Sequence, residues 1–135
     1  MGPPTALTAR QCMSAPVVTV DPDMDVVAAM QVLLTHRISG VPVVDNQGSL
    51  VGILTERDCL KTVIIAGYHG ECACGTVADY MTRNVAAVDV NESLVDVAER
   101  FVNTKFRRYP VLDEQRLVGI ISRRDVVRAV LQSAG

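Results

Sequence analysis

The sequence predicts an α+β protein made of two pseudo-symmetric β-α-β-β-α repeats packed into one module. Three observations lead to this prediction. The second half of the chain repeats the first, each half contains a helix pattern with one apolar face, and each half contains two apolar runs joined by a short turn. With 135 residues and 49% hydrophobic content, the chain can bury a core without disulfides or metals to support it.

The internal repeat is visible when the chain is compared with itself. A shift of 68 positions places Thr8 on Thr76, and a one-residue deletion then changes the shift to 67, which places Asp58 on Asp125. A repeat of this length is marginally stable alone, so the two repeats should pack on each other. We therefore predict a first repeat over residues 8–66, a linker loop over residues 67–75 and a second repeat over residues 76–132.

The elements within each repeat follow from turn signals and hydrophobic periodicity. One apolar helix face occurs in both repeats, as Val26, Ala29, Met30, Leu33 and Leu34 and as Leu94, Val97, Ala98, Phe101 and Val102. The first repeat should contain a helical turn capped by Thr8, a strand over 17–20, a helix capped by Asp23, a hairpin of strands over 41–45 and 50–54, and a helix over 56–65. The second should contain a turn capped by Thr76, a strand over 85–88, a helix capped by Asn91, strands over 109–113 and 117–121, and a helix over 123–132.

Each repeat carries a hydroxyl residue and, three positions later, an aspartate at the end of its hairpin. The two copies are Thr55-x-x-Asp58 and Ser122-x-x-Asp125. One interpretation is a capping box, in which both side chains satisfy free N–H groups at a helix start. The other is a ligand site, because a helix start attracts phosphate and an aspartate accepts hydrogen bonds from ribose hydroxyls. The motif alone leaves both interpretations open.

Composition argues against several classes of protein. The net charge of −2 is too small to indicate binding to nucleic acid or to a membrane surface. No apolar run is long enough to span a bilayer, and the first residues lack the regions of a signal peptide, so we expect a cytoplasmic protein. The sequence shows no nucleophile–base pair and no Walker loop. We therefore do not expect an enzyme, and we interpret Gly52 and Gly119 as packing glycines.

The four cysteines allow two interpretations. Cys12 and Cys59 stand singly in apolar surroundings, where a reduced cysteine behaves as a small hydrophobic residue. Cys72 and Cys74 form a C-x-C pair close to His69, but no second pair with zinc spacing accompanies them. Free thiols are therefore favoured over a metal or redox site.

The order of elements and the repeated string Pro-Val-Val-Asp, Leu-Val-Gly-Ile and Thr-x-x-Asp resemble a tandem pair of CBS (cystathionine β-synthase) domains, the Bateman module. The resemblance extends from about Thr8 to Leu131. It implies a regulatory module that binds an adenosine nucleotide, AMP first and then ATP, ADP or NAD, and that controls a separate partner protein through conformation or assembly. It also implies a homodimer, with neither nucleic acid nor membrane as a partner.

The resemblance further implies two nucleotide clefts. The first would use Thr55 and Asp58 for ribose or phosphate, Arg107 and Arg108 from the facing repeat for phosphate, and Ser14, Pro16, Val18, Ile38, Ser39 and Gly40 around the adenine. The second would use Ser122 and Asp125, with Thr82, Asn84, Ala86 and Phe106 around the base and His36 and Arg37 near the phosphate. Because Arg107-Arg108 replaces the small Ser39-Gly40 pair in the second repeat, we expect the first cleft to be preferred.

Other functions remain open at this point. The module could be a ligand-free dimerisation or scaffold unit, as the capping-box interpretation allows, or an enzyme that processes the nucleotide. Arg107 and Arg108 could also be a solvated helix end, where cations are favoured by the helix dipole. His36 is more readily explained as a surface helix residue than as a base, since no nucleophile or carboxylate is placed to work with it.

Overall fold

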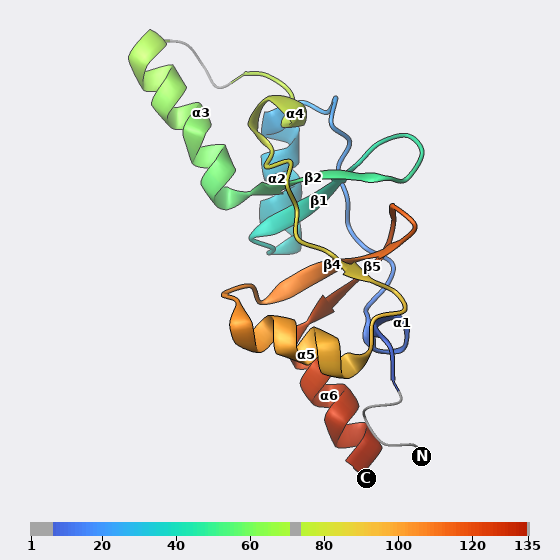
Figure 1. Ribbon diagram of the computed structural model, residues 1–135. Coiled ribbons are helices and arrows are strands. Elements are labelled where there is room, and N and C mark those ends of the chain that lie inside the picture. The colour runs from blue at the N-terminus through green and yellow to red at the C-terminus, as the bar shows by residue number, and fades with distance from the viewer. Residues whose placement is uncertain (1–6, 71–73, 135) are drawn as a thin grey trace. The chain divides into compact units, whose positions relative to one another are not determined.

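The computed structural model describes residues 7–70 and 74–134 (Figure 1). Its mixture of helices and strands confirms the predicted α+β class. The helices within the described ranges are α1 (Ala9–Cys12), α2 (Val26–His36), α3 (Glu56–His69), α4 (Val77–Tyr80), α5 (Leu94–Asn103) and α6 (Arg123–Ala134). The strands are β1 (Gly40–Val44), β2 (Leu50–Thr55), β3 (Val88–Asp89), β4 (Arg108–Asp113) and β5 (Arg116–Ser122).

The chain folds as two compact units that differ from the two sequence repeats. Residues 18–85 form one unit, here called the central unit. Residues 7–17 and 86–134 form the described part of the other, here called the split unit. The first helical turn of each repeat, α1 or α4, therefore belongs to the unit that contains the hairpin of the other repeat.

The central unit is organised around the antiparallel β1–β2 hairpin, in which Gly40 pairs with Thr55. Gly48, with a φ of 82°, occupies the turn, as the hairpin prediction required. Val20 joins the hairpin through a parallel bridge to Val43. Buried residues from the hairpin, α2 and the α4 segment make up one core: Val20, Val26, Ala29, Leu33, Val41, Val43, Leu54, Val77, Tyr80 and Met81.

The split unit contains a three-stranded sheet in the order β3-β4-β5, with β3 parallel and β5 antiparallel to β4. Figure 1 shows α5 and α6 on the same side of the β4–β5 hairpin. The ring centroids of Phe101 and Tyr109 lie 4.9 Å apart in the core. Ala9 of α1 is buried in the same core.

Helices α2 and α5 begin later than the sequence predicts. Their N-caps are Asp25 and Ser93, not Asp23 and Asn91. The backbone N–H of Asp23 donates to the carboxylate of Asp21, and the backbone N–H of Asn91 donates to the carboxylate of Asp89 in the same way. These side chain-to-backbone turns hold the chain out of the helix for two more residues.

Two other predicted boundaries also change. The run over 17–20 contributes only the bridge at Val20, while the matching run over 85–88 leads into the short strand β3. Helix α3 continues to His69, so the first residues of the predicted linker are helical. It ends at Gly70, whose φ of 66° and N–H bond to the carbonyl of Ala66 are typical of a C-terminal glycine cap.

Candidate functional site

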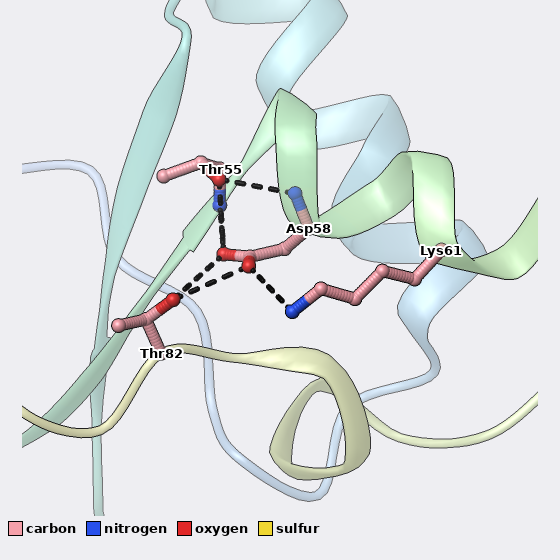
Figure 2. Close-up of polar contacts among 4 residues, drawn as sticks. All are labelled: Thr55, Asp58, Lys61 and Thr82. Atoms are coloured by element: carbon pink, nitrogen blue, oxygen red, sulfur yellow. Dashed lines mark hydrogen bonds and ion pairs between the residues drawn. The ribbon is translucent and has the colours of Figure 1, made fainter.

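The first candidate site lies where β2 runs into α3 (Figure 2). The backbone N–H of Asp58 donates to Thr55 Oγ1 at 3.1 Å, and the backbone N–H of Thr55 donates to Asp58 Oδ2 at 2.9 Å. These reciprocal bonds are the capping box that the sequence predicts. The box fixes both side chains at the positively polarised end of the helix.

The Asp58 carboxylate has more partners than a capping box needs. The hydroxyl of Thr55 donates to Oδ2 at 2.9 Å, and the hydroxyl of Thr82 donates to Oδ1 at 3.2 Å. Lys61 Nζ donates to Oδ1 at 3.1 Å and forms an ion pair with it. Asp58 is only 4% exposed, so these protein donors take the place of most of the water that would solvate an exposed carboxylate.

The pKa of Asp58 reflects opposing effects. Burial raises the pKa, but hydrogen bonds from the Thr55 backbone, from Lys61 and from the Thr55 hydroxyl, together with the charge of Lys61, outweigh burial and hold the pKa below its ordinary value. The group is therefore an anion at neutral pH, and it can act as a hydrogen-bond acceptor only.

Gly52 explains how Thr82 reaches this carboxylate. Ile53 and Thr82 exchange two backbone hydrogen bonds of 2.9 Å, which place the α4 segment beside β2. A Cβ atom on Gly52 would lie 2.6 Å from Met81 Sδ and 2.9 Å from the carbonyl oxygen of Thr82. Only glycine permits this approach, so Gly52 is a packing glycine, as predicted.

The second candidate site repeats this arrangement in the split unit. Ser122 Oγ accepts the N–H of Asp125 at 3.1 Å, and Asp125 Oδ2 accepts the N–H of Ser122 at 2.8 Å. Asp125 Oδ1 accepts the hydroxyl of Ser14 at 3.3 Å and Nη1 of Arg128 at 3.0 Å. Gly119 makes room for the carbonyl of Ser14 as Gly52 does for that of Thr82.

Two candidate residues each contact the aspartate of the other predicted cleft. Thr82 was assigned with Asp125 and Ser14 with Asp58, but Thr82 bonds to Asp58 and Ser14 bonds to Asp125. The sequence-based assignment kept the segment after each helical turn, which contains Ser14 or Thr82, with the aspartate of its own repeat. In the folded chain, the segment that follows the first helical turn of one repeat pairs with the hairpin of the other.

The remaining candidates in the central unit include Ser39, Arg37 and His36. The Ser39 carbonyl accepts the N–H of Glu56 at 2.9 Å, so the predicted Ser39-Gly40 wall does adjoin the start of α3. Exposed Arg37 caps α2 with a φ of 54°. His36 Nδ1 lies 3.0 Å from the Val32 carbonyl, which supports its interpretation as a helix residue. Three more candidates belong to this unit: Val18 and Ile38, which are half-buried, and Asn84, which is exposed.

Three of the remaining candidates in the split unit, Phe106, Arg107 and Arg108, lie near the start of α6. The Arg107 carbonyl accepts the N–H of Arg123, and Arg108 pairs with Ser122 in the sheet. Both arginines are exposed. Phe106 lies edge-on to Tyr109, with ring centroids 5.6 Å apart. Pro16 and Ala86 are exposed.

Sequence reasoning missed Lys61 and Arg128, the cations that bind the two aspartates. Each lies three residues after its aspartate, on the same face of the helix, at the spacing where opposite charges meet. A search for cations three or four residues after each motif would have found both.

Residues 7–70 and 74–134 contain no group of three or more His, Cys, Asp and Glu side chains placed to hold a metal ion. Cys72 lies outside the described residues. Cys12, Cys59 and Cys74 are free thiols. Burial, with help from nearby carboxylates, raises the pKa of Cys12 and Cys59. Across the same ranges, no helix combines the length and apolar character needed to cross a membrane.

Comparison with known proteins matches both repeats. The CBS domain model matches residues 9–65 and 77–132. The chain is 34% identical over 119 residues to the uncharacterized protein MJ1225 of Methanocaldococcus jannaschii, covering 88% of this chain and 41% of that protein. It thus spans less than half the length of that relative.

Two solved structures have the same fold. One is CBSX2 of Arabidopsis thaliana in complex with AMP, with a TM-score of 0.80 and 32% identity, covering 96% of this chain and 100% of that one. The other is the CBS domain pair of MJ0100 in complex with 5-methylthioadenosine and S-adenosyl-L-methionine, with a TM-score of 0.70 and 29% identity over 95% of this chain and 98% of that one. With two matched repeats and these shared folds, the chain belongs to the CBS domain family as a tandem CBS pair.

Proposed function

We propose that this chain is a regulatory CBS module that binds an adenosine nucleotide and controls a partner protein through ligand-dependent conformation or assembly. The observation that carries the proposal is the pair of equivalent buried carboxylates, Asp58 and Asp125, each at a helix start. Each accepts a hydrogen bond from a hydroxyl group of a neighbouring segment, Thr82 for Asp58 and Ser14 for Asp125. The complexes of CBSX2 with AMP and of MJ0100 with two adenosine derivatives support an adenosine ligand.

The proposed chemistry follows from what these groups can do. An ionised aspartate at the end of a helix accepts hydrogen bonds from vicinal ribose hydroxyls, which a neutral amide would accept less strongly. Exposed Arg107 and Arg108 suit phosphate because a guanidinium group donates two parallel hydrogen bonds. AMP is the first ligand to test, followed by ATP, ADP, NAD and S-adenosyl-L-methionine.

Calorimetric titration of the full chain with AMP tests this function. Asp58→Asn or Asp125→Asn, at whichever site is occupied, should weaken AMP binding roughly tenfold or more, because one charge-assisted hydrogen bond is lost. A 2′-deoxy ligand should show a similar loss on the wild-type chain and little further loss on that variant, since both changes remove the same interaction.

Asp79→Asn is the matched control. Asp79 accepts the backbone N–H of Thr76 at 2.9 Å in the capping box of α4, but it is exposed and belongs to no proposed site. Its loss should leave AMP affinity unchanged. Failure of every adenosine ligand to bind would reject the sensor function.

The alternative is a ligand-free dimerisation or scaffold module. It is favoured by the exposed apolar side chains of α3 and α6, which need no nucleotide to associate. In that case the chain would self-associate, none of the adenosine ligands would bind, and the two aspartates would affect only stability.

A further inference from the structure

The Asp58 carboxylate has no free acceptor position. An ionised carboxylate offers about four lone-pair positions. At Oδ2 they are used by the N–H and the hydroxyl of Thr55, and at Oδ1 by the hydroxyl of Thr82 and the ammonium group of Lys61. A ribose that donates its hydroxyls to Asp58 must therefore displace a donor that is already bound.

Lys61 is the donor that can leave most easily. The Thr55 donors are fixed by the start of α3, and Thr82 is held beside β2 by its two backbone bonds to Ile53. The side chain of Lys61 is 55% exposed and reaches back along α3 to Oδ1 (Figure 2). Its flexible stem and well-hydrated ammonium group let it move into water at little cost.

Asp125 offers a useful comparison within the same chain. It receives the N–H of Ser122, the hydroxyl of Ser14 and one nitrogen of Arg128. Those three donors leave one acceptor position unused, so a first ribose hydroxyl can bind there without displacing the resident cation. A first ribose hydroxyl therefore meets a competing donor at Asp58 but not at Asp125, and a second hydroxyl would meet one at both.

We propose that Lys61 is a specificity-determining residue that competes with the ribose for Asp58 and must be displaced when a nucleoside binds there. This inference rests on the proposed nucleotide-binding function. The displaced ammonium group leaves a positive charge beside the site, which a phosphorylated ligand can neutralise and an uncharged nucleoside cannot. Lys61 therefore shifts the preference of the site from nucleosides towards nucleotides.

The test compares adenosine with AMP in calorimetric titrations of the full chain carrying Asp125→Asn, so that the Asp58 site reports alone. In that chain, Lys61→Met should tighten adenosine binding roughly two- to fivefold, the range expected for removing an exposed ion pair. AMP should gain less, so the ratio of its affinity to that of adenosine should fall. Lys61→Gln, in a chain with Asp125 intact, repeats the comparison should the double variant fail to fold.

Arg57→Met is the matched control for charge. Arg57 is an exposed cation of the same helix, and none of the hydrogen bonds or ion pairs among the described residues joins it to Asp58. Its loss removes one positive charge without removing a competitor, so it should not tighten adenosine binding. The difference between the two variants isolates the contact made by Lys61.

The outcomes separate this inference from the proposed function. Tighter adenosine binding in Lys61→Met than in Arg57→Met supports it, as does adenosine binding that appears only when Lys61 is removed. Equal or weaker binding in Lys61→Met, while the wild-type chain binds AMP, overturns the inference and leaves the function intact. Loss of all binding in Asp125→Asn alone also overturns it, since the ligand then occupies the other site. Absence of binding by every variant rejects both.

Discussion

Gly52 controls where the hydroxyl of Thr82 lies, because the missing Cβ lets the α4 segment pack against β2. Gly52→Ala should lower the free energy of unfolding by about 1–3 kcal/mol, the usual cost of overpacking. Gly67→Ala is the control, because a Cβ there meets nothing within 4 Å on the surface of α3. It should be neutral or stabilising by about 0.5–1 kcal/mol. Urea denaturation of both variants makes the comparison, and equal effects would contradict the packing role.

Arg107 and Arg108 test the phosphate part of the proposal. Replacing both with alanine should weaken AMP binding roughly ten- to 150-fold for one lost charge-assisted bond, but it should barely change adenosine binding. Arg116→Ala, at an exposed cation next to the hairpin turn, should alter neither affinity. Calorimetric titration provides the measurement. Equal losses for AMP and adenosine would show that the arginines act through the fold.

The chemistry of single residues was predictable only where it is local in sequence. The capping boxes at Thr55 and Ser122 follow from residues three positions apart, and both are present. The contacts of Thr82 and Ser14 join residues 24 and 111 positions apart. No pattern in one repeat encodes such contacts, because backbone pairing between distant segments decides them.

At the scale of elements, the helix faces were predictable from their period and the helix starts were not. Most of each expected apolar face is buried in a core, as a spacing of three and four residues predicts. Its last residue is not, because Leu34 of α2 and Val102 of α5 are 73% and 83% exposed. Two neighbouring aspartates both suit an N-cap by residue type. Asp25 caps α2, because the carboxylate of Asp21 already holds the N–H of Asp23 in a turn.

Helices α3 and α6 leave equivalent apolar side chains exposed, and from these we propose that the chain forms the homodimer that the sequence resemblance implies. Leu60, Val63 and Ile64 on α3 match Val127, Val130 and Leu131 on α6, and all six are exposed. A groove of about 400 Å³ between α5 and α6 adds apolar surface, with Phe101 and Val126 in its lining. Patches of this kind are common at interfaces between subunits.

Light scattering tests this assembly. The full chain should have twice its monomer mass of 14.6 kDa at micromolar concentration. Ile64→Glu combined with Leu131→Glu should shift it to the monomer, because burying two charges in an apolar interface is unfavourable. Val27→Glu, on partly exposed α2, should leave the dimer intact. A monomer mass for the unmodified chain, with and without nucleotide, would reject the dimer.

At the scale of the whole molecule, the folding units differ from the repeats of the sequence. A fragment of residues 18–85 should unfold cooperatively, because it keeps all the buried residues of the central unit. A fragment of residues 8–66 should not, because it lacks Val77, Tyr80 and Met81 from the same core. Losing a large buried side chain costs about 2–5 kcal/mol, so the three losses together are comparable to the whole stability of a unit this small. Circular dichroism during heating compares the two, and similar transitions would show that the repeats fold by themselves.

The two-fold repetition of the chain was evident from its sequence, but the exchange of segments between repeats was not. Two halves with the same order of elements are equally compatible with a segment that folds back on its own half and with one that pairs with the other. The pairs Ser14–Ile120 and Ile53–Thr82 choose the second arrangement. Both choices bury the same kinds of residue, so composition and periodicity cannot distinguish them.

The division of the split unit between distant parts of the chain also sets the order in which the protein can fold as it is made. All of residues 18–85 emerge from the ribosome before Ile120, the backbone partner of Ser14. At ordinary synthesis rates, the chain from Ser14 to Ile120 takes on the order of 5–20 s to make. During that time Met13 and Cys12 lack the surface they finally cover. A newly made chain is therefore open to capture by chaperones, or to pairing with another chain, at Cys12 and Met13 until Ile120 has been made.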